Sequence, residues 1–174
     1  MKILITGHKG YIGSRLYKKL INLGYNVAGI DLKDNKSIID CLPDENYDYV
    51  FHLAAFPSVQ FSVENPSYTM KNNVLSSSVL LEWCVKNKVK RLIFSSSAAA
   101  ESIESPYGLQ KRITEMECEL FSKLYDLDTV CLRYYNVYSE DQEFNGPYST
   151  VINHWMNSIE KKRPLFLDGD GEQT

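Results

Sequence analysis

Short apolar runs alternate along the chain with longer stretches whose apolar residues recur every three or four positions. The short runs predict buried strands at Lys2–Thr6, Asn26–Ile30, Tyr47–Ala55, Arg91–Ser95 and a segment that begins at Asp128 and leaves the strand at Asn136. The longer stretches predict helices at Ile12–Leu23, Pro66 to about Lys88, Pro106 to about Leu124 and Val151–Ile159. Because strands alternate with helices, we expect an α/β fold with a doubly wound, mostly parallel sheet.

Three segments carry weaker signals. Ser37–Leu42 is compatible with either a strand or a short helix, and the segment from Lys33 to Asp48 is too short for a full strand–helix pair. Gly146-Pro147 predicts a turn, and Pro164–Leu167 predicts a further short strand.

Two of the helices show apolar stripes that indicate how they pack. The helix Pro66–Lys88 has two stripes, which suggests burial on two sides or at a subunit interface. They consist of Met70, Val74, Leu81 and Val85, and of Leu75, Val79 and Trp83. For the helix Pro106–Leu124 the expected core stripe is Leu109, Ile113, Met116, Leu120 and Leu124. This arrangement places Tyr107 and Lys111 on a face that is not the core stripe.

Three glycines lie between the first strand and the first helix, at three-residue intervals. Gly7 permits a tight turn, Gly10 lets the backbone approach a pyrophosphate, and Gly13 lets the helix pack closely on the strand. The free N–H groups and the dipole of the helix N-terminus favour the same anion. The alternative is an ordinary glycine-rich turn, but the strand–turn–helix context favours a dinucleotide phosphate site.

Asp31 follows the second strand, 18 residues beyond Gly13. A carboxylate at this place accepts hydrogen bonds from both hydroxyls of an adenosine ribose and repels a 2′-phosphate, so it favours NAD. The alternative is a solvated loop acid, and the nearby Lys33 leaves NADP open.

Tyr107 and Lys111 lie one helical turn apart, on one face of their helix. An ammonium at that distance stabilises the phenolate and lowers the tyrosine pKa, which suits an acid/base catalyst. A serine hydroxyl at the end of the preceding strand can bond the same oxygen. The alternative is a solvated helix face. His52, inside a predicted strand, is expected to be a packed and hydrogen-bonded core residue.

Composition narrows the class of protein. The chain has 174 residues, 44% of them hydrophobic and 24% charged, with a net charge of −3. These values fit one ordinary globular domain and give no reason to expect nucleic acid or a membrane as partner. The apolar runs are too short to span a bilayer and the chain starts directly with a strand, so we expect a cytoplasmic protein. The four cysteines are expected to be free thiols, and the scattered histidines predict no metal site.

Eight motifs then occur in order: TGHKGYIG, Asp31, FHLAA, NNV, FSSSAA, SPYGLQK, LRYYNVY and PLFLDGDGEQT. Together they resemble the extended short-chain dehydrogenase/reductase family, in particular its NAD-dependent nucleotide-sugar epimerase/dehydratase group. Within that group the chain is most similar to UDP-hexose 4-epimerases. The resemblance implies a Rossmann-type NAD-binding domain over residues 1–147. It also implies that residues 148–174 begin a substrate-binding lobe.

The resemblance also implies roles for particular residues. Ser97, Tyr107 and Lys111 match the catalytic serine, tyrosine and lysine, and Ser97 and Asn136 would contact the substrate. The matched cofactor-binding residues are Gly7, Gly10, Tyr11, Ile12, Gly13, Asp31, Leu53, Ala54, Ala55, Asn72, Tyr107, Lys111 and Tyr135. The implied substrate is a nucleotide sugar, of the UDP-linked kind.

In the implied 4-epimerisation, Tyr107 takes the proton of the sugar 4-hydroxyl while hydride passes to NAD and then returns to the other face of the sugar. Ala98 and Ala99 stand where a 4,6-dehydratase carries an Asp–Glu pair, which counts against dehydration. Two alternatives remain. They are an NADPH-dependent nucleotide-sugar reductase, and a non-catalytic NAD- or nucleotide-binding module.

The chain departs from the family pattern in three places. The segment between Ser97 and Tyr107 and the segment from Lys33 to Asp48 are shorter than in the family. The sequence also ends at Thr174, before the family's R-D motif and C-terminal substrate lobe. We therefore expect that lobe to be largely absent, turnover by this chain to be weak or absent, and the uncovered apolar surface to favour a homo-oligomer.

Overall fold

The computed structural model describes residues 1–139, 151–167 and 169–171. The chain divides into two compact units, Met1–Tyr134 and Tyr135–Thr174. The first unit contains the sheet, and the described part of the second contains one helix.

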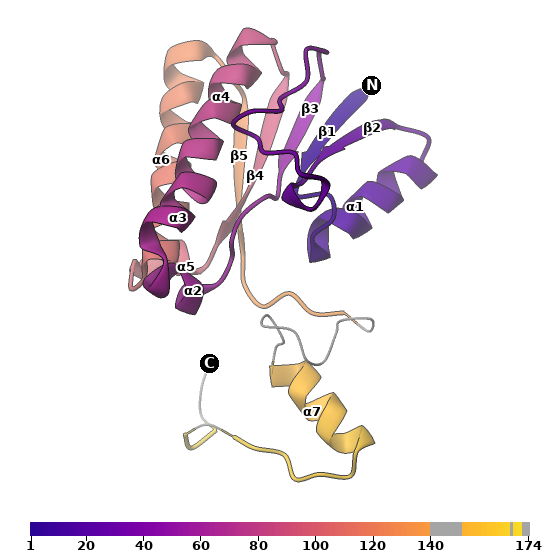
Figure 1. Ribbon diagram of the computed structural model, residues 1–174, viewed down its shortest axis with the longest axis vertical. Helices are drawn as coiled ribbons and strands as arrows, with labels where there is room; N and C mark the ends of the chain where they lie inside the picture. The colour runs from indigo at the N-terminus through magenta and orange to yellow at the C-terminus, as the bar shows by residue number, and fades with distance from the viewer. Residues whose placement is uncertain (140–150, 168, 172–174) are drawn as a thin grey trace. The chain divides into compact units, whose positions relative to one another are not determined.

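The first unit is built on a five-stranded sheet in which every pair of neighbours is parallel (Figure 1). The strand order is β2-β1-β3-β4-β5. The strands are β1 (Lys2–Thr6), β2 (Asn26–Ile30), β3 (Tyr49–His52), β4 (Arg91–Ser97) and β5 (Thr129–Tyr134). All five strands were predicted, so the expected parallel α/β fold is confirmed. Their ends differ by a few residues, since β3 and β5 are shorter than the apolar runs suggest.

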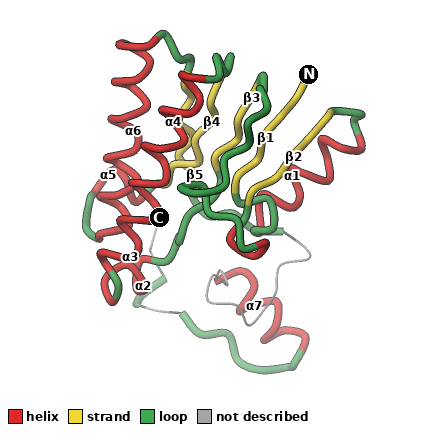
Figure 2. The backbone as a smooth tube through the Cα atoms, turned by 45° about the horizontal axis from the view of Figure 1, so that its top comes forward, coloured by secondary structure: helices red, strands yellow, loops and turns green. Residues whose placement is uncertain are grey.

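Helices pack on both faces of this sheet. Those of the first unit are α1 (Tyr11–Asn22), α2 (Val59–Glu64), α3 (Pro66–Met70), α4 (Ser76–Lys86), α5 (Ala99–Ser102) and α6 (Pro106–Tyr125). Helix α1 lies beside β1 and β2, whereas α4 and α6 lie on the other side (Figure 2). A 3₁₀ turn, Leu32–Asp34, follows β2, and a π-helical turn, Lys71–Leu75, joins α3 to α4.

The main core lies between the sheet and helices α4 and α6. Because side chains alternate between the faces of a strand, every second residue of each strand enters this core. Its largest fully buried members are Leu4, Val50, Leu80, Leu81, Leu92 and Phe94. On the opposite face, α1 covers Ile3 and Ile5 of β1, which are also buried.

The expected core stripe of α6 is wrong. Leu109, Met116, Leu120 and Leu124 are 40–62% exposed and Ile113 is only half-buried. The face that enters the core instead carries Tyr107, Gly108, Gln110, Lys111, Thr114 and Cys118. The polar members of that face have hydrogen-bond partners inside the fold, which offset the free-energy cost of removing them from water.

The long helix expected from Pro66 to Lys88 is interrupted by the π turn at Lys71–Leu75 and ends at Lys86. One extra residue per turn rotates the following helix about its axis. As a result, Leu80, Leu81 and Cys84 point into the core, while Met70 and Leu75 stay exposed. The short helices α2 and α5 were not predicted.

The remaining expectations have mixed outcomes. Ser37–Leu42 forms neither a strand nor a helix, and the second unit contains the expected helix as α7 (Val151–Glu160). Pro164–Leu167 is not a strand, and Gly146-Pro147 lies outside the described residues. The four cysteines are free thiols. Over the described parts of the chain, no helix has the length and apolar character needed to cross a membrane.

His52 lies fully buried in the middle of the core, as predicted. Its Nδ1 lies 2.7 Å from Thr6 Oγ1 and its Nε2 lies 2.8 Å from Ser77 Oγ. The ring also packs against Phe94. Burial, with a smaller contribution from Lys111, lowers the pKa of His52 to about 3. The imidazole is therefore neutral in the folded protein.

We predict that this histidine makes the fold sensitive to acid. In the unfolded chain its pKa is about 6.5, so the unfolded state binds a proton that the folded state excludes, and stability falls as pH drops below that value. Between pH 6.5 and 5 the free energy of unfolding should fall by about 1.5 kcal/mol from this residue alone. Urea unfolding at several pH values measures this change in the free energy of unfolding.

The variant His52→Gln should be less stable throughout but should lose this pH dependence. His154→Gln, which changes an exposed histidine of α7, is the matched control and should keep it. Equal pH slopes for the wild type and His52→Gln would contradict the prediction.

Candidate functional site

The carboxyl ends of β1, β3 and β4 meet at one edge of the sheet. The strand that follows β1 in the chain lies on one side of it, and the next strand, β3, lies on the other. Such a reversal of winding leaves a crevice at the carboxyl ends of the strands, where open α/β sheets bind their ligands. The glycine turn leaves β1 at this point, so the topology alone marks this edge as the candidate site.

The three glycines have the conformations and contacts that the motif predicts. Gly7 has a φ of +73°, and an added Cβ would lie 2.7 Å from the Ala54 nitrogen. A Cβ on Gly13 would lie 2.1 Å from the Gly7 carbonyl oxygen, so only glycine lets α1 approach the turn. At Gly10 the only heavy atom near an added Cβ is that same oxygen, at 3.1 Å. A methyl group at Gly10 would therefore require a shift of only a few tenths of an ångström, far less than at Gly13.

Helix α1 begins at Tyr11, directly after this turn. The preceding residue, Gly10, has no side chain that could cap the helix. Ile12 and Gly13 belong to the first turn of the helix, whose backbone N–H groups and partial positive charge favour an anion. The turn is thus suited to bind phosphate through its backbone.

Asp31 lies beside the glycine turn and is 9% exposed. Its Oδ2 accepts a hydrogen bond from the Lys9 backbone nitrogen at 2.8 Å, and its Oδ1 accepts one from the Lys33 nitrogen at 2.9 Å. These two bonds fix the orientation of the carboxylate. Because β1 and β2 are neighbours, the acid that ends β2 is brought to the turn that ends β1.

Leu53, Ala54 and Ala55 follow β3 at the same edge. Leu53 donates its backbone N–H to the Thr6 carbonyl oxygen at 3.1 Å, and the N–H of Ala54 lies 3.3 Å from Thr6 Oγ1. These contacts hold the chain against β1 where Gly7 passes closest to it. The small alanine side chains leave room above the turn.

The two asparagines of the π turn point in different directions. Asn72 is half-buried, and its side chain donates to the Tyr68 carbonyl oxygen at 2.9 Å. Asn73 is buried: its Oδ1 accepts from the Phe56 nitrogen at 2.8 Å and its Nδ2 donates to Gln110 Oε1 at 2.8 Å. Asn73 therefore ties the segment after β3 to α6, a role that the sequence did not reveal. A cofactor contact by Asn72 stays a prediction.

Tyr107 enters the fold at the N-terminus of α6, where helices leave backbone N–H groups without partners. Ser105 is the N-cap and accepts from the Gly108 nitrogen at 3.0 Å. The Tyr107 nitrogen donates to Ser62 Oγ of α2 at 3.1 Å. Two serine hydroxyls, one local and one distant in sequence, thus fix the backbone that carries Tyr107.

Lys111 lies one turn further along α6 and is buried behind Tyr107. Its Nζ donates to the Ser95 carbonyl oxygen at 2.6 Å and lies 4.7 Å from the centre of the Phe94 ring. The Nζ is 5.7 Å from the centre of the Tyr107 ring. Burial lowers the pKa of Lys111 to about 7, so its charge is poised near neutral pH. A group with these properties at a strand end is typical of a functional site.

The three serines that end β4 differ in their partners. Ser95 donates its hydroxyl proton to the His52 carbonyl oxygen, and Ser96 donates its own to Glu115 Oε1. Ser97 instead accepts a hydrogen bond from the Ala99 nitrogen at 3.2 Å. The hydroxyls of Ser95 and Ser96 thus point to a neighbouring strand and to α6, whereas that of Ser97 bonds the backbone that follows β4, and its catalytic role stays a prediction.

The connection from Ser97 to Tyr107 is short and tightly packed. It consists of α5 and a turn in which Ile103 has a φ of +53°, a strained value for a β-branched residue. A Cβ on Gly108 would lie 2.3 Å from the Ala99 carbonyl oxygen. Gly108 therefore lets the start of α6 press against this connection, a close approach that the sequence analysis did not find.

Tyr135 and Asn136 begin the second compact unit and are both exposed. The structure thus gathers the glycines, Asp31, Ala54, Ser97, Tyr107 and Lys111 within the first unit. Tyr135 and Asn136 belong to the second unit, and their contacts with cofactor and substrate stay predictions. Within the described ranges, no group of histidine, cysteine or acidic side chains could hold a metal ion.

We predict that Gly13→Ala destabilises the fold by about 2–3 kcal/mol, because its methyl group would overlap the Gly7 carbonyl oxygen. This cost outweighs the better helix propensity of alanine, which is worth up to about 1 kcal/mol. Gly10→Ala is the matched control and should cost less than about 1 kcal/mol, since its contact is looser. Urea unfolding measures both, and equal stability of the two variants would contradict the prediction.

Comparison with known proteins agrees with this geometry. Residues 3–174 match the model of the NAD dependent epimerase/dehydratase family. A putative UDP-glucose 4-epimerase of Methanocaldococcus jannaschii is 31% identical over an alignment 207 positions long, which covers 99% of this chain and 67% of the relative. The alignment is longer than the chain, as expected if segments of this chain are abbreviated.

Two solved structures show the same fold. UDP-glucose 4-epimerase of Thermotoga maritima, solved with UDP-glucose, has a TM-score of 0.83 and 34% identity, covering 99% of this chain and 67% of that one. UDP-glucuronic acid 4-epimerase of Bacillus cereus, solved with UDP-glucuronic acid and NAD, has a TM-score of 0.81 and 27% identity, with the same coverage. This chain thus spans about two thirds of their length, and it belongs to the NAD dependent epimerase/dehydratase family.

Proposed function

We propose that this chain is the cofactor-binding part of an NAD-dependent nucleotide-sugar 4-epimerase. The observation that carries the proposal is the position of Lys111, buried at the carboxyl end of β4, one turn behind Tyr107 and at the same sheet edge as the glycine turn. An acid/base pair beside a phosphate-binding turn is the arrangement that hydride and proton transfer on a nucleotide-bound sugar requires.

NAD would bind along the sheet edge. Its pyrophosphate would lie at the turn of Gly7, Gly10 and Gly13, with backbone contacts from Tyr11 and Ile12. Asp31 would accept hydrogen bonds from the adenosine ribose. Leu53, Ala54 and Ala55 would line the cofactor, and Asn72 and Tyr135 would complete the site. The bound NAD would take hydride from the sugar and return it, so it would remain a resident cofactor.

The side chains of this unit would handle the proton. Tyr107, as phenolate, would take the proton of the sugar 4-hydroxyl, and Ser97 would bond the same sugar oxygen. When protonated, Lys111 stabilises the phenolate, because an ammonium one turn away lowers the free energy of the negative charge. Its lowered pKa lets that charge respond to the bound cofactor near neutral pH. Asn136 would contact the substrate diphosphate.

The substrate class is proposed as UDP-linked sugars, which the relatives named above act on or bind. The comparisons give no support to the reductase alternative. For this 174-residue chain by itself we propose weak or no turnover, since the match leaves a third of the relatives' length without a counterpart. Sugar orientation and exclusion of water contribute much of the rate in such enzymes.

The proposal predicts that the purified chain, stripped of bound nucleotide, binds NAD more tightly than NADP in a calorimetric titration. Gly10→Ala should weaken NAD binding at least tenfold, because its methyl group would lie where the backbone approaches the pyrophosphate. Gly24→Asn is a control, since Gly24 lies in an open turn after α1 and asparagine tolerates its positive φ.

Failure of the wild type to bind NAD, or unchanged binding by Gly10→Ala, would disprove the cofactor site. The same preparation is then assayed with UDP-glucose and UDP-N-acetylglucosamine. Rapid epimerisation of either sugar by the 174-residue chain would contradict the proposal of weak turnover.

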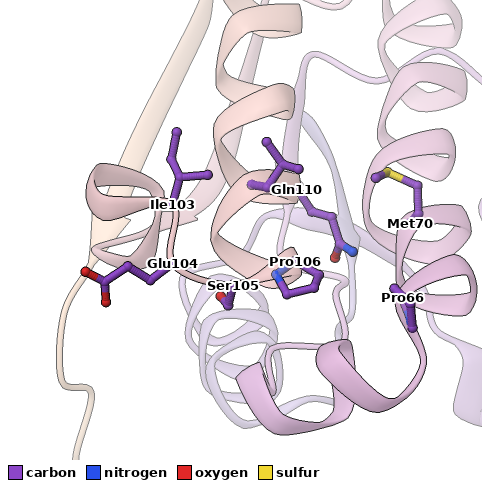
Figure 3. A pocket seen from close by; sticks show the side chains of 8 residues that line it. Pro66, Met70, Ile103, Glu104, Ser105, Pro106 and Gln110 are labelled. Atoms are coloured by element: carbon purple, nitrogen blue, oxygen red, sulfur yellow. The ribbon is translucent and has the colours of Figure 1, made fainter.

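We further propose that the chain self-associates through α6. The exposed apolar residues of this helix form one stripe, with Met116 and Leu124 58% and 62% exposed. At the start of the stripe, Leu109 borders a largely apolar hollow of about 440 Å³. Pro66 and Met70 of α3 line the same hollow (Figure 3). A contiguous apolar surface across two helices is typical of an interface between copies of a chain.

Sedimentation equilibrium should therefore show a dimer or larger assembly. The double variant Met116→Glu and Leu120→Glu should shift it towards monomer, because two charges would be buried in the interface. Ser122→Glu adds a charge to an exposed position of α6 outside the stripe and should leave the mass unchanged. A wild type that stays monomeric at all concentrations would contradict this part of the proposal.

A further inference from the structure

The glycine turn lies beside a second loop, and both carry charged side chains. The glycine turn carries His8 and Lys9, and the loop that follows β2 carries Asp31, Lys33 and Asp34. Backbone hydrogen bonds join Asp31 to Lys9 and to Lys33, and Lys33 Nζ donates to the Lys9 carbonyl oxygen at 3.1 Å. The backbone of both lysines is therefore held against the Asp31 carboxylate, with the Lys33 ammonium bonded to the backbone of Lys9.

Asp34 binds the ammonium group of Lys9. Its carboxylate forms an ion pair and hydrogen bond with Lys9 Nζ, and its second oxygen lies 3.5 Å from His8 Nε2. The bond to Lys9 lowers the pKa of Asp34, an effect opposed by desolvation and assisted by His8 and Lys36. Asp34 is therefore ionised at neutral pH and held at the glycine turn.

This arrangement bears on the choice between NAD and NADP. The acid that ends the second strand of this fold accepts the ribose 2′-hydroxyl, and a 2′-phosphate would replace that hydroxyl in NADP. Repulsion by Asp31 opposes the phosphate. Lys9, however, adjoins Asp31, and a free ammonium there would attract the phosphate through a charge-assisted hydrogen bond. Repulsion by Asp31 alone therefore does not account for a preference for NAD.

We infer that Asp34 is a specificity-determining residue for the cofactor: by holding the Lys9 ammonium it denies that cation to a ribose 2′-phosphate and so favours NAD over NADP. This inference depends on the proposed function, because it assigns the adenosine ribose to Asp31. It predicts that two carboxylates share the discrimination against NADP. Asp31 repels the 2′-phosphate, and Asp34 neutralises the Lys9 ammonium that would otherwise bind it.

The test is a calorimetric titration of the stripped chain with NAD and with NADP at low ionic strength, where charge effects are least screened. Asp34→Asn should raise the ratio of NADP affinity to NAD affinity about tenfold, since one charge-assisted contact to phosphate is gained. Adding Lys9→Met to this variant should abolish the gain. Asp44→Asn removes the same charge from an exposed acid of another loop and should leave the ratio unchanged.

Three results would overturn the inference. They are an unchanged affinity ratio in Asp34→Asn, an equal gain in Asp44→Asn, and a gain that survives Lys9→Met. Each of these would leave the proposed function intact so long as the wild type binds NAD. If the wild type bound neither dinucleotide, the proposed function would fail and the inference would fail with it.

Discussion

The arrangement of the first unit depends on a chain of buried hydrogen bonds that runs through His52. The imidazole bonds Thr6 of β1 and Ser77 of α4, and Ser77 donates in turn to the carbonyl oxygen of Asn73. The side chain of Asn73 continues to Gln110 of α6. These groups are almost fully buried, so each bond that is lost would leave a polar atom without a partner in a low-dielectric interior. The strand ends and the helices that carry the site are thereby fixed together.

Lys111 is buried beside this chain of hydrogen bonds and is linked to it through Ser95. The lysine donates to the carbonyl oxygen of Ser95, whose hydroxyl donates to the carbonyl oxygen of His52. A buried amine is tolerated when its donors are satisfied and it can lose its proton. The same environment that stabilises the fold therefore sets the charge state of the residue behind Tyr107.

Local sequence patterns were enough to predict the sheet and its glycine turn. Strands such as Lys2–Thr6 are continuous apolar runs, and Gly7 and Gly13 stand where the backbone leaves no room for a side chain. The position of Asp31 follows from the end of β2, because neighbouring parallel strands end at the same edge. These features are set by neighbours in sequence or by the rules of parallel sheets, which explains why they could be predicted.

The orientation of α6 could not be predicted in this way. An apolar stripe has the same periodicity whether it faces a core or an uncovered surface, and on α6 the stripe of Met116 and Leu124 is the exposed one. Burial of Gln110 and Lys111 depends on partners that lie far away in sequence. Ser62 and Asn73 were missed for the same reason, since only the folded chain brings Ser62 to Tyr107 and Asn73 to Phe56.

The strained turn at Ile103 indicates where this protein can change most easily. The start of α6 is held by its N-cap Ser105, the residue before the helix, and by Ser62 and Lys111, which lie outside the connection between Ser97 and Tyr107. Added residues in that connection would relieve the left-handed conformation of Ile103, and each doubling of a loop's length costs only about 0.6 kcal/mol in closure entropy. Evolution or design can therefore lengthen this connection, and give it new side chains, while the helix that carries Tyr107 stays in place.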